Sequence, residues 1–342
     1  MGILLDQHWK WRTIQTILLS LYLLATIVLL GITLNIPATI NAGTDRPLLD
    51  GQTFNIWPGC APGSEGLTLK EEIVQRSTEP TKVNNRFAWK ILNPTLTVYL
   101  PKKSNGAGIL IAPGGGYQRV VLDKEGEEIA FWLTSLGITC FILRYRLPGE
   151  GHQQGSDVPL QDAQRAMRII RKKASTWGLD PNRLGIMGFS AGGHVASSLG
   201  VKYHHQVYQS IDDIDEVNAR PDFLILGYPV ITMLDEFVHI GSRNQLLGKQ
   251  PTKKRIAAYS NELYVTKATP QTFIMHAIDD PSVPVENSIN FGLALKKARV
   301  PVEMHLFKDG GHGFSIRLTQ GKTCRLWPEL CAEWLKSIGI IK

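Results

Sequence analysis

Short apolar runs and amphipathic segments alternate along most of the chain. Runs of about six apolar residues predict strands at Arg86–Leu92, Thr95–Leu100, Gly108–Ala112, Ile138–Arg144, Arg183–Gly188, Phe223–Tyr228, Thr272–Ala277 and Val302–Phe307. Apolar residues at helical spacing predict helices at Lys124–Leu136, Val158–Trp177, Ala191–Leu199, Glu286–Ala298 and Leu326–Ile338. Such alternation is typical of an α/β domain with a mostly parallel sheet of about eight strands and helices on both faces. The continuous apolar character of the later strands indicates burial on both sides.

Two connections depart from simple alternation. Only Asn93 and Pro94 separate the first two strands, which predicts an antiparallel hairpin at the sheet edge. The polar stretch 202–221 has no strand pattern and is expected to form an excursion over the sheet. The helix at Val158–Trp177 carries a basic stripe, for which a solvated helix face is the expected setting. Its members are Arg165, Arg168, Arg171, Lys172 and Lys173.

The N-terminal segment differs from the rest of the chain. No charged residue occurs from Thr13 to Thr44, and Ile17–Leu34 is almost wholly apolar. At about 1.5 Å per residue this run spans about 27 Å, close to a bilayer core. Lys10 and Arg12 precede it, which predicts that this flank stays cytoplasmic while the following chain crosses the membrane. An uncleaved signal-anchor and a cleaved signal peptide both stay open for residues 1–45. Residues 46–342 are predicted to form one domain outside the cytoplasm.

Composition narrows the class of protein without assigning a function. Of the 342 residues, 43% are hydrophobic and 20% charged, which excludes disordered, collagen-like and coiled-coil proteins. Lys and Arg outnumber Asp and Glu by 37 to 30, a mild excess that predicts no nucleic-acid partner unless it is concentrated. Four cysteines are too few for a disulfide scaffold. Cys324 and Cys331 are close enough in the sequence to bridge in an oxidising compartment, which leaves a disulfide open.

A serine lies at the turn between a predicted strand and a predicted helix. The segment Gly188-Phe189-Ser190-Ala191-Gly192 matches the G-x-S-x-G nucleophile elbow. The elbow needs glycines because a Cβ at either flanking position would collide with the adjoining backbone. The pattern therefore predicts that the Ser190 hydroxyl is raised above the sheet as a nucleophile. A glycine-rich turn without catalytic function is the alternative.

A second glycine cluster, Pro113-Gly114-Gly115-Gly116-Tyr117, follows the strand at Gly108–Ala112. Acyl transfer creates an oxyanion, and backbone N–H groups are its natural donors. The amides of Gly114, Gly115 and Ala191 are therefore predicted to form an oxyanion hole. A phosphate-binding loop fits poorly, because no Gly-Lys-Ser/Thr ends the cluster and dinucleotide spacing needs glycine where Arg119 stands. A plain turn is the remaining alternative.

An acid and a histidine that serve this serine are expected after it in the chain. The loop after Thr272–Ala277 holds Asp279 and Asp280, of which Asp280 is preferred because it lies further into the loop. His312 stands between glycines after the last predicted strand, with room to reach both partners. Because parallel strands end at one edge of a sheet, Ser190, Asp280 and His312 are expected to converge as a triad.

The remaining candidate residues carry weaker signals. Tyr117 and Tyr228 come just after strand ends and are predicted to line a substrate pocket, with core or rim packing as an equal alternative. His194 and His276 lie near the serine and the acid, where a local hydrogen bond is the expected role. No H-E-x-x-H pattern occurs, and the other histidines lack partners at metal-ligand spacing, so neither a metal site nor a cofactor is predicted.

Together these motifs resemble those of a known family. The segment starting Trp177-Gly178-Leu179-Asp180-Pro181, the GFSAGGH elbow, PGGGY, DDPSVPVENS and KDGGHGF are similar to α/β-hydrolase esterases grouped with bacterial acetylxylan esterases and lipase-like enzymes. The similarity runs from about Phe54 to Leu335. It implies the α/β-hydrolase fold and a serine carboxylesterase that removes acetyl groups from sugars or polysaccharides.

The sequence thus predicts an extracytoplasmic acetyl esterase acting on small-molecule or oligosaccharide esters, associated with the membrane through its N-terminal segment. Two alternatives are weighed against it. A serine exopeptidase of the same fold would use the same triad on peptide bonds. A membrane-tethered binding module would keep the fold without catalysis.

Overall fold

A computed structural model describes residues 40–41 and 47–342 of the chain. Ile40–Lys342 forms one compact unit. The predicted membrane segment and the predicted boundary at residue 45 lie outside the described residues. Within the described ranges, no helix is both long enough and apolar enough to span a bilayer.

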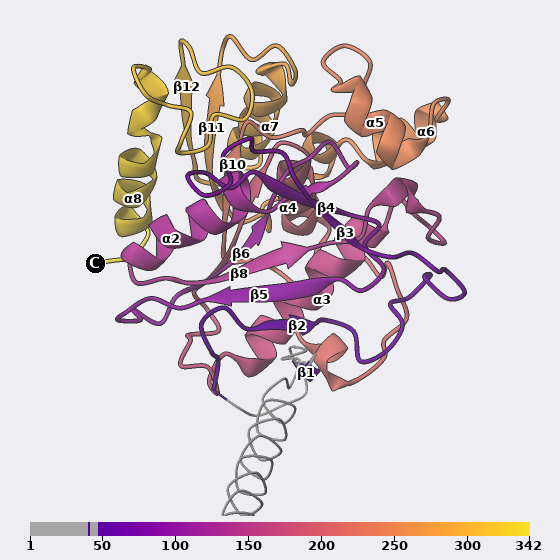
Figure 1. The fold of residues 1–342 in the computed structure, drawn as a ribbon. Coiled ribbons are helices and arrows are strands. Elements are labelled where there is room, and N and C mark those ends of the chain that lie inside the picture. The colour runs from indigo at the N-terminus through magenta and orange to yellow at the C-terminus, as the bar shows by residue number, and fades with distance from the viewer. Residues whose placement is uncertain (1–39, 42–46) are drawn as a thin grey trace, which may run out of the picture. The chain divides into compact units, whose positions relative to one another are not determined.

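The centre of the fold is a nine-stranded sheet (Figure 1). In spatial order its strands are β1 (Ile40–Asn41), β2 (Thr53–Asn55), β5 (Thr95–Tyr99), β8 (Thr139–Arg144), β6 (Gly108–Ala112), β9 (Leu184–Phe189), β10 (Phe223–Gly227), β11 (Gln271–Ala277) and β12 (Val302–Phe307). From β8 to β12 all neighbours are parallel, whereas β5 is antiparallel to both β2 and β8. The predicted mostly parallel sheet is confirmed.

A second, three-stranded sheet contains β3 (Glu72–Gln75), β4 (Arg86–Trp89) and β7 (Val120–Val121). The predicted hairpin between the first two strands is therefore wrong, because β4 pairs with β3 and β7 while β5 joins the central sheet. Lys90, directly after β4, has a φ of +55°, which redirects the chain before Asn93 and Pro94. β7 follows the predicted oxyanion loop, so the second sheet is joined to that loop.

Helices cover both faces of the central sheet. They are α2 (Glu128–Ser135, preceded by a π-helical turn at Asp123–Glu127), α3 (Val158–Lys173), α4 (Ala191–Lys202), α5 (Ile240–Leu247), α6 (Lys253–Ala258), α7 (Glu286–Lys297) and α8 (Trp327–Ser337). Alternate strand residues face separate cores, as the period of a strand requires. In β6, Leu110 and Ala112 pack with α3, α4 and α7, while Ile109 and Ile111 pack with α2 and α8.

Burial on both faces holds for the inner strands but not for β12. Every residue of β9 and β10 is buried, whereas most of β12 is partly exposed. The reason is its place at the edge of the sheet. The two buried thiols of Cys324 and Cys331 are free, so the disulfide left open by the sequence is not formed.

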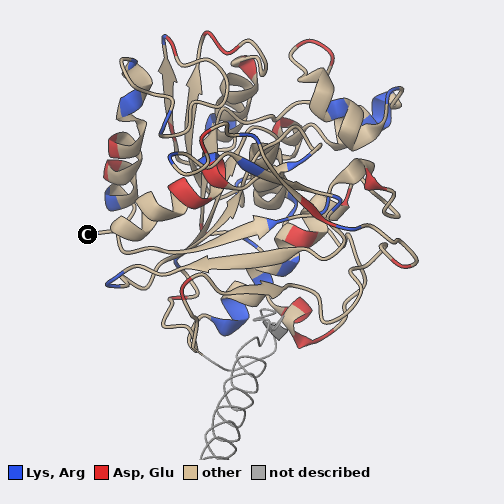
Figure 2. Ribbon diagram, in the orientation of Figure 1, with Lys and Arg blue, Asp and Glu red and all other residues tan. Residues whose placement is uncertain are grey.

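The arginines of the basic stripe on α3 do not form a solvated face, whereas Lys172 is exposed. Figure 2 shows basic and acidic residues interspersed over the ribbon. Arg165 is 1% exposed and binds both carboxylate oxygens of Asp212, at 2.6 and 2.7 Å. It also lies 3.0 Å from Asp215. Arg168 donates to the carbonyl of Val217 at 3.0 Å. The stripe therefore anchors the polar excursion 202–221, because buried guanidinium groups require acceptors.

The segment with α5 and α6 leaves the sheet between β10 and β11 and is closed at its base. The Asn261 amide donates to the Ile231 carbonyl at 3.1 Å, and the Met233 amide donates to Ser260 Oγ at 2.9 Å. The two ends of this segment therefore lie side by side, and α5 and α6 extend beyond them (Figure 1).

Candidate active site

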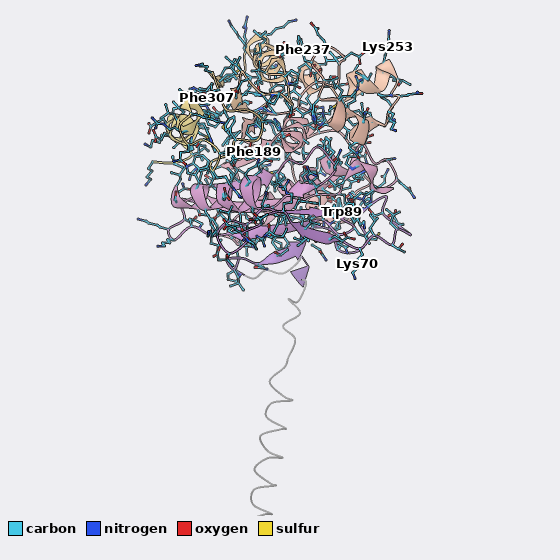
Figure 3. All side chains as sticks on the ribbon, turned by 45° about the horizontal axis from the view of Figure 1, so that its top comes forward. Lys70, Trp89, Phe189, Phe237, Lys253 and Phe307 are labelled. Atoms are coloured by element: carbon cyan, nitrogen blue, oxygen red, sulfur yellow. The ribbon has the colours of Figure 1, made fainter. Side chains whose placement is uncertain are left out.

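Ser190 occupies the sharp turn between β9 and α4. Its φ of +52° and ψ of −122° are unusual for a residue with a side chain. A Cβ at Gly188 would lie 2.2 Å from the Gly192 carbonyl oxygen, and one at Gly192 would lie 2.0 Å from the Ala112 carbonyl oxygen. Both glycines are thus required by close backbone approach, as expected. Figure 3 labels the preceding residue, Phe189.

The structure brings the three predicted triad residues together. Ser190 Oγ lies 2.9 Å from His312 Nε2, and His312 Nδ1 lies 2.7 Å from Asp280 Oδ2. Because a carboxylate accepts hydrogen bonds, Nδ1 carries the proton in this arrangement. Nε2 is then the acceptor for the Ser190 hydroxyl. This is the hydrogen-bond order that activates a serine.

Asp280 is fully buried and surrounded by donors. Its Oδ1 accepts the amides of Ser282 and Val283 at 2.8 and 2.9 Å, and its Oδ2 also receives His276 Nε2 at 3.2 Å. Burial by itself raises the pKa of Asp280, but the hydrogen bonds from His276 and His312 outweigh it and hold the pKa well below the ordinary value. The carboxylate therefore stays charged next to His312.

Asp279, the alternative acid, has a different task. Its Oδ1 accepts the amides of Gly310 and Gly311, both at 2.8 Å. These glycines immediately precede His312 in the chain. Asp279 thus holds the loop that presents His312, while Asp280 contacts the imidazole.

One of the three predicted oxyanion donors, the Gly114 amide, already has an acceptor in the structure. The Gly114 amide donates to Glu125 Oε2 at 2.9 Å, so the prediction that it serves an oxyanion is wrong. The amides of Gly115 and Ala191 have no acceptor among the described residues. Gly115 has a φ of +140°, and a Cβ there would lie 2.1 Å from the Arg119 carbonyl oxygen. Of the three predicted donors, Gly115 and Ala191 therefore keep amides that are available to an oxyanion.

Glu125 is a site residue that the sequence did not single out. It is 3% exposed, and its Oε1 accepts the Tyr228 hydroxyl at 3.0 Å while Oε2 accepts the Gly114 amide. Lys124 Nζ lies 3.7 Å from Glu125 Oε1 and donates to the Gly313 carbonyl at 2.6 Å. The pair thus joins the glycine loop to the loop of His312. The only sequence signal was two charged residues at the start of a predicted helix, which ordinarily indicates solvent exposure.

The two tyrosines predicted to line a pocket differ in position. Tyr228 is fully buried, with its ring centroid 5.2 Å from that of His312. Core packing is thus the setting found for Tyr228, and the substrate-lining prediction for it is wrong. Tyr117 is 1% exposed but borders a cleft, and its hydroxyl lies 2.7 Å from His194 Nδ1. His194 Nε2 donates to the Tyr259 carbonyl at 2.7 Å, and burial lowers the pKa of His194 to about 3.

His239 is a second residue that the sequence left without a role. It precedes α5, and its Nδ1 accepts the Ser242 amide at 3.2 Å, so its Nε2 carries the proton when the ring is neutral. Burial lowers the pKa of His239. A protonated His312 would lower it further, whereas the charge of Asp280 raises it. No group of three or more metal-ligating side chains occurs within residues 40–41 and 47–342.

Comparison with known families decides where the chain belongs. A profile of the BD-FAE family matches residues 96–295, more than half of the chain. The chain belongs to the BD-FAE family. The match covers the glycine loop, Ser190 and Asp280 of this BD-FAE domain and ends before His312. The α/β-hydrolase resemblance drawn from the motifs is confirmed.

Individual relatives of the BD-FAE domain are esterases and xylan-degrading enzymes. An acetylxylan esterase of Xylanibacter ruminicola is 35% identical over 247 residues, which are 71% of this chain and 48% of the relative. Endo-1,4-beta-xylanase B of Butyrivibrio fibrisolvens is 38% identical over 208 residues, 61% of this chain and 32% of that protein. The chain thus matches less than half the length of either relative. The crystal structure of an acetyl ester-xyloside bifunctional hydrolase from Caldicellulosiruptor lactoaceticus has 34% identity and a TM-score of 0.71, covering 86% of this chain and 99% of that one.

The geometry of this BD-FAE domain suits one type of chemistry. A serine is hydrogen-bonded to a histidine that a buried carboxylate orients, and the amides of Gly115 and Ala191 have no acceptor among the described residues. Such a set can attack a carbonyl carbon and stabilise the resulting oxyanion.

Proposed function

We propose that this protein is a serine carboxylesterase that removes acetyl groups from carbohydrate esters. The observation that carries the proposal is the chain of hydrogen bonds from Ser190 Oγ through His312 to Asp280, at 2.9 and 2.7 Å. The strained backbone of Ser190 and the amides of Gly115 and Ala191, which have no acceptor among the described residues, support the proposal. No metal or cofactor is needed for this chemistry.

In the proposed reaction, Ser190 Oγ attacks the ester carbonyl carbon as its proton passes to His312 Nε2. The amides of Gly115 and Ala191 stabilise the negative charge that develops on the carbonyl oxygen. The C–O bond to the alcohol then breaks, and the alcohol takes the proton from His312. Water attacks the acyl-serine in the same way, with His312 as base, and the acid leaves as Ser190 regains its proton.

The carbohydrate part of the proposal rests on two names. The relative from Xylanibacter ruminicola is an acetylxylan esterase, and the similar crystal structure is of an acetyl ester-xyloside bifunctional hydrolase. Both names join an acetyl ester to a xylose-based substrate. An acetylated xylo-oligosaccharide is therefore the substrate class that we propose for this chain.

We also propose that the protein is located outside the cytoplasm and that its N-terminal segment is the targeting signal. The apolar run Ile17–Leu34, preceded by Lys10 and Arg12, supports this proposal. Fusion of residues 1–45 to alkaline phosphatase, which is active only outside the cytoplasm, tests it. Active fusions are expected, and fusions inactive despite normal expression would contradict the proposal.

The catalytic proposal is tested with the purified protein and a fluorescent fluorophosphonate. Wild type is expected to be labelled and to hydrolyse 4-nitrophenyl acetate and acetylated xylo-oligosaccharides. Ser190→Ala should lose both properties, while the control Ser282→Ala, which changes an exposed serine of the Asp280 loop, should keep them. Hydrolysis of an aminoacyl-4-nitroanilide without ester hydrolysis would indicate the exopeptidase instead. Absence of labelling in wild type would indicate a binding module.

A further inference from the structure

A cleft of about 750 Å³ opens next to the glycine loop. Phe87 and Trp89 of β4 line one side of it, and Gln118 and Arg119 of the loop line the other. Phe87 and Trp89 are two positions apart in one strand, so they face the same way, while the intervening Ala88 is buried. Figure 3 labels Trp89. None of the residues that line this cleft takes part in the reaction proposed above.

The glycine loop connects the cleft to the reacting serine. A Cβ at Gly114 would be 2.9 Å from Ser190 Cβ, and a Cβ at Gly115 would be 2.9 Å from Arg119 Cγ. Gly114 thus contacts the serine, and its neighbour Gly115 contacts the stem of Arg119. A single substrate molecule could therefore contact Arg119 with one group while its ester lies at Ser190.

Within residues 40–41 and 47–342, no carboxylate forms an ion pair with the guanidinium group of Arg119. Its Nε is buried and has no hydrogen-bond acceptor among the described residues. Its recorded contact is with the ring of Phe87, whose centroid is 5.2 Å from Arg119 Cζ. A guanidinium is a permanent charge with several N–H donors arranged to bind a carboxylate. Burying part of such a group without an acceptor costs free energy, so the arrangement favours an acceptor brought by a ligand.

The carboxylates of the segment that follows Arg119 in the chain have other partners. Asp123 and Glu127 both bind Arg86, at 2.6 and 3.0 Å. Glu125 receives the Gly114 amide and the Tyr228 hydroxyl. These side chains therefore leave the charge of Arg119 uncompensated.

Two further charged groups lie near Phe87 and the cleft. Glu150 lines the cleft and accepts the amides of Lys90 and Ile91. Arg76 also lies near the Phe87 ring, with its Cζ 5.3 Å from the ring centroid, and its guanidinium donates to Asn85. Two guanidinium groups thus contact one phenyl ring, and neither forms an ion pair with a carboxylate of the described residues.

We propose that this cleft binds a carboxylate of the ester substrate through Arg119. The inference rests on the proposed esterase function and adds a substrate class to it. The carboxylate has two chemical sources. It stands on the alcohol side in an acetylated uronic acid sugar, or on the acyl side in a half-ester of a dicarboxylic acid. In both cases the anion pairs with Arg119 while the ester carbonyl occupies the Gly115 and Ala191 amides.

The test compares matched pairs of esters that differ only in charge. On the alcohol side, acetylated methyl glucuronoside is compared with its carboxamide by acetate release. On the acyl side, ethyl hydrogen succinate is compared with ethyl succinamate by acid release. Wild type is expected to prefer the charged member of one pair about tenfold or more in kcat/KM, since hydrogen bonds to charged groups are strong. The pair that shows the preference identifies the source of the carboxylate.

Variants assign the preference to one side chain. Arg119→Gln is expected to lower the ratio of charged to neutral kcat/KM about tenfold, and Arg119→Lys should keep part of it. Arg325→Gln, which removes the same charge from an exposed residue, should leave the ratio unchanged. Equal rates for both members of each pair in wild type, or an unchanged ratio in Arg119→Gln, would overturn the proposal.

A binding measurement separates this proposal from the esterase proposal. Calorimetric titration with methyl glucuronoside and with succinate needs no turnover. Binding of one of them by wild type and its loss in Arg119→Gln support the carboxylate site even if no ester is hydrolysed. Fluorophosphonate labelling and 4-nitrophenyl acetate turnover without charge preference or carboxylate binding leave the esterase proposal standing and refute the carboxylate site.

Discussion

His276 Nε2 lies 3.2 Å from the Asp280 oxygen that also accepts His312 Nδ1. The Val283 carbonyl lies 3.1 Å from the same His276 nitrogen, so this nitrogen faces two acceptors and must carry a proton. Ser288 Oγ lies 2.8 Å from the other ring nitrogen. His276 and His312 therefore both donate to one oxygen of the acid in the candidate triad.

This relationship predicts a positioning role for His276. His276→Ala removes one donor from a buried carboxylate, and kcat for 4-nitrophenyl acetate is expected to fall about tenfold. His276→Asn retains an N–H donor and should recover part of the loss. Steady-state kinetics of both variants, with melting temperatures as a folding control, give the answer. Equal losses in the two variants, in step with lost stability, would indicate a purely structural residue.

Glu125 is expected to fix the conformation of the predicted oxyanion loop through its hydrogen bond with the Gly114 amide. Glu125→Ala removes the acceptor of both the Gly114 amide and the Tyr228 hydroxyl, so the neighbouring Gly115 amide loses its fixed position. Because one oxyanion donor is worth about 10²–10³ in kcat, its misplacement should cost at least tenfold, with a smaller change in KM. Glu125→Gln keeps an oxygen acceptor and should lose less. A KM effect without a kcat effect would argue against this role.

Gly115 and Gly116 form a matched pair for testing the loop. A Cβ at Gly115 meets the Arg119 carbonyl at 2.1 Å, whereas a Cβ at Gly116, with a φ of +66°, meets nothing within 4 Å. Gly115→Ala should therefore displace the loop and abolish most activity. Gly116→Ala carries only backbone strain of about 1 kcal/mol and should stay active. Comparable kcat values for the two variants would show that the Gly115 contact does not matter.

His194 links stability to pH. The pKa of this buried ring is lowered to about 3 in the folded chain, against an ordinary value of about 6.5. Below pH 6.5 the unfolded chain takes up a proton that the folded chain does not, so stability falls as the pH falls. From pH 7 to pH 5 the loss from this group is about 2 kcal/mol.

Urea unfolding of wild type and His194→Asn at the two pH values isolates this contribution. The variant has no titrating group at this position, so its loss of stability on acidification should be smaller by about 2 kcal/mol. His152, whose pKa burial lowers to about 4, acts with the same sign in both proteins and cancels in the comparison. Identical pH dependence in the two proteins would contradict the assignment.

The arginine anchors of α3 predict a contrast in stability. Arg165→Met removes the nearer of two arginines from the buried Asp215, which keeps Arg168 at 4.0 Å and the hydrogen bond from Tyr208. Breaking a buried pair in this way costs about 3–5 kcal/mol. Lys172→Met breaks an exposed pair with Asp213 and should cost about 0–1 kcal/mol. Unfolding free energies measured in urea at one pH decide between them, and similar values would mean that the 202–221 excursion is not held by Arg165.

Local patterns were sufficient to predict the residues that converge at the strand ends. Ser190, Asp280 and His312 each follow a strand with strong apolar character, so the order of strands and loops predicted their meeting. Gly114 and Glu125 show where this reasoning stops. A glycine-rich loop indicates amides that can bind an oxyanion. The Gly114 amide is already bound to Glu125, eleven positions further along the chain. The burial of Glu125 depends on the tertiary structure, so the local sequence pattern could not predict this hydrogen bond.

The errors in the fold have similar physical causes. The predicted hairpin assumed that strands adjacent in sequence pair, whereas β5 pairs instead with β2, a strand too short to show a period. The prediction of a solvated stripe on α3 assumed that its arginine side chains are exposed to solvent. Asp212 and Asp215 lie within the polar excursion 202–221 and could have been recognised as their partners, because a segment crossing a basic helix needs acidic side chains.

The closed base of the α5–α6 segment makes it an exchangeable unit for protein engineering. Its ends are tied to each other by the Met233–Ser260 and Ile231–Asn261 hydrogen bonds, so a replacement for residues 234–258 needs only to bridge two neighbouring points. His239 is part of that replaceable stretch, while Ser190, Asp280 and His312 are outside it. Grafting segments of other lengths and compositions there offers a way to diversify substrate range without altering the hydrolytic centre.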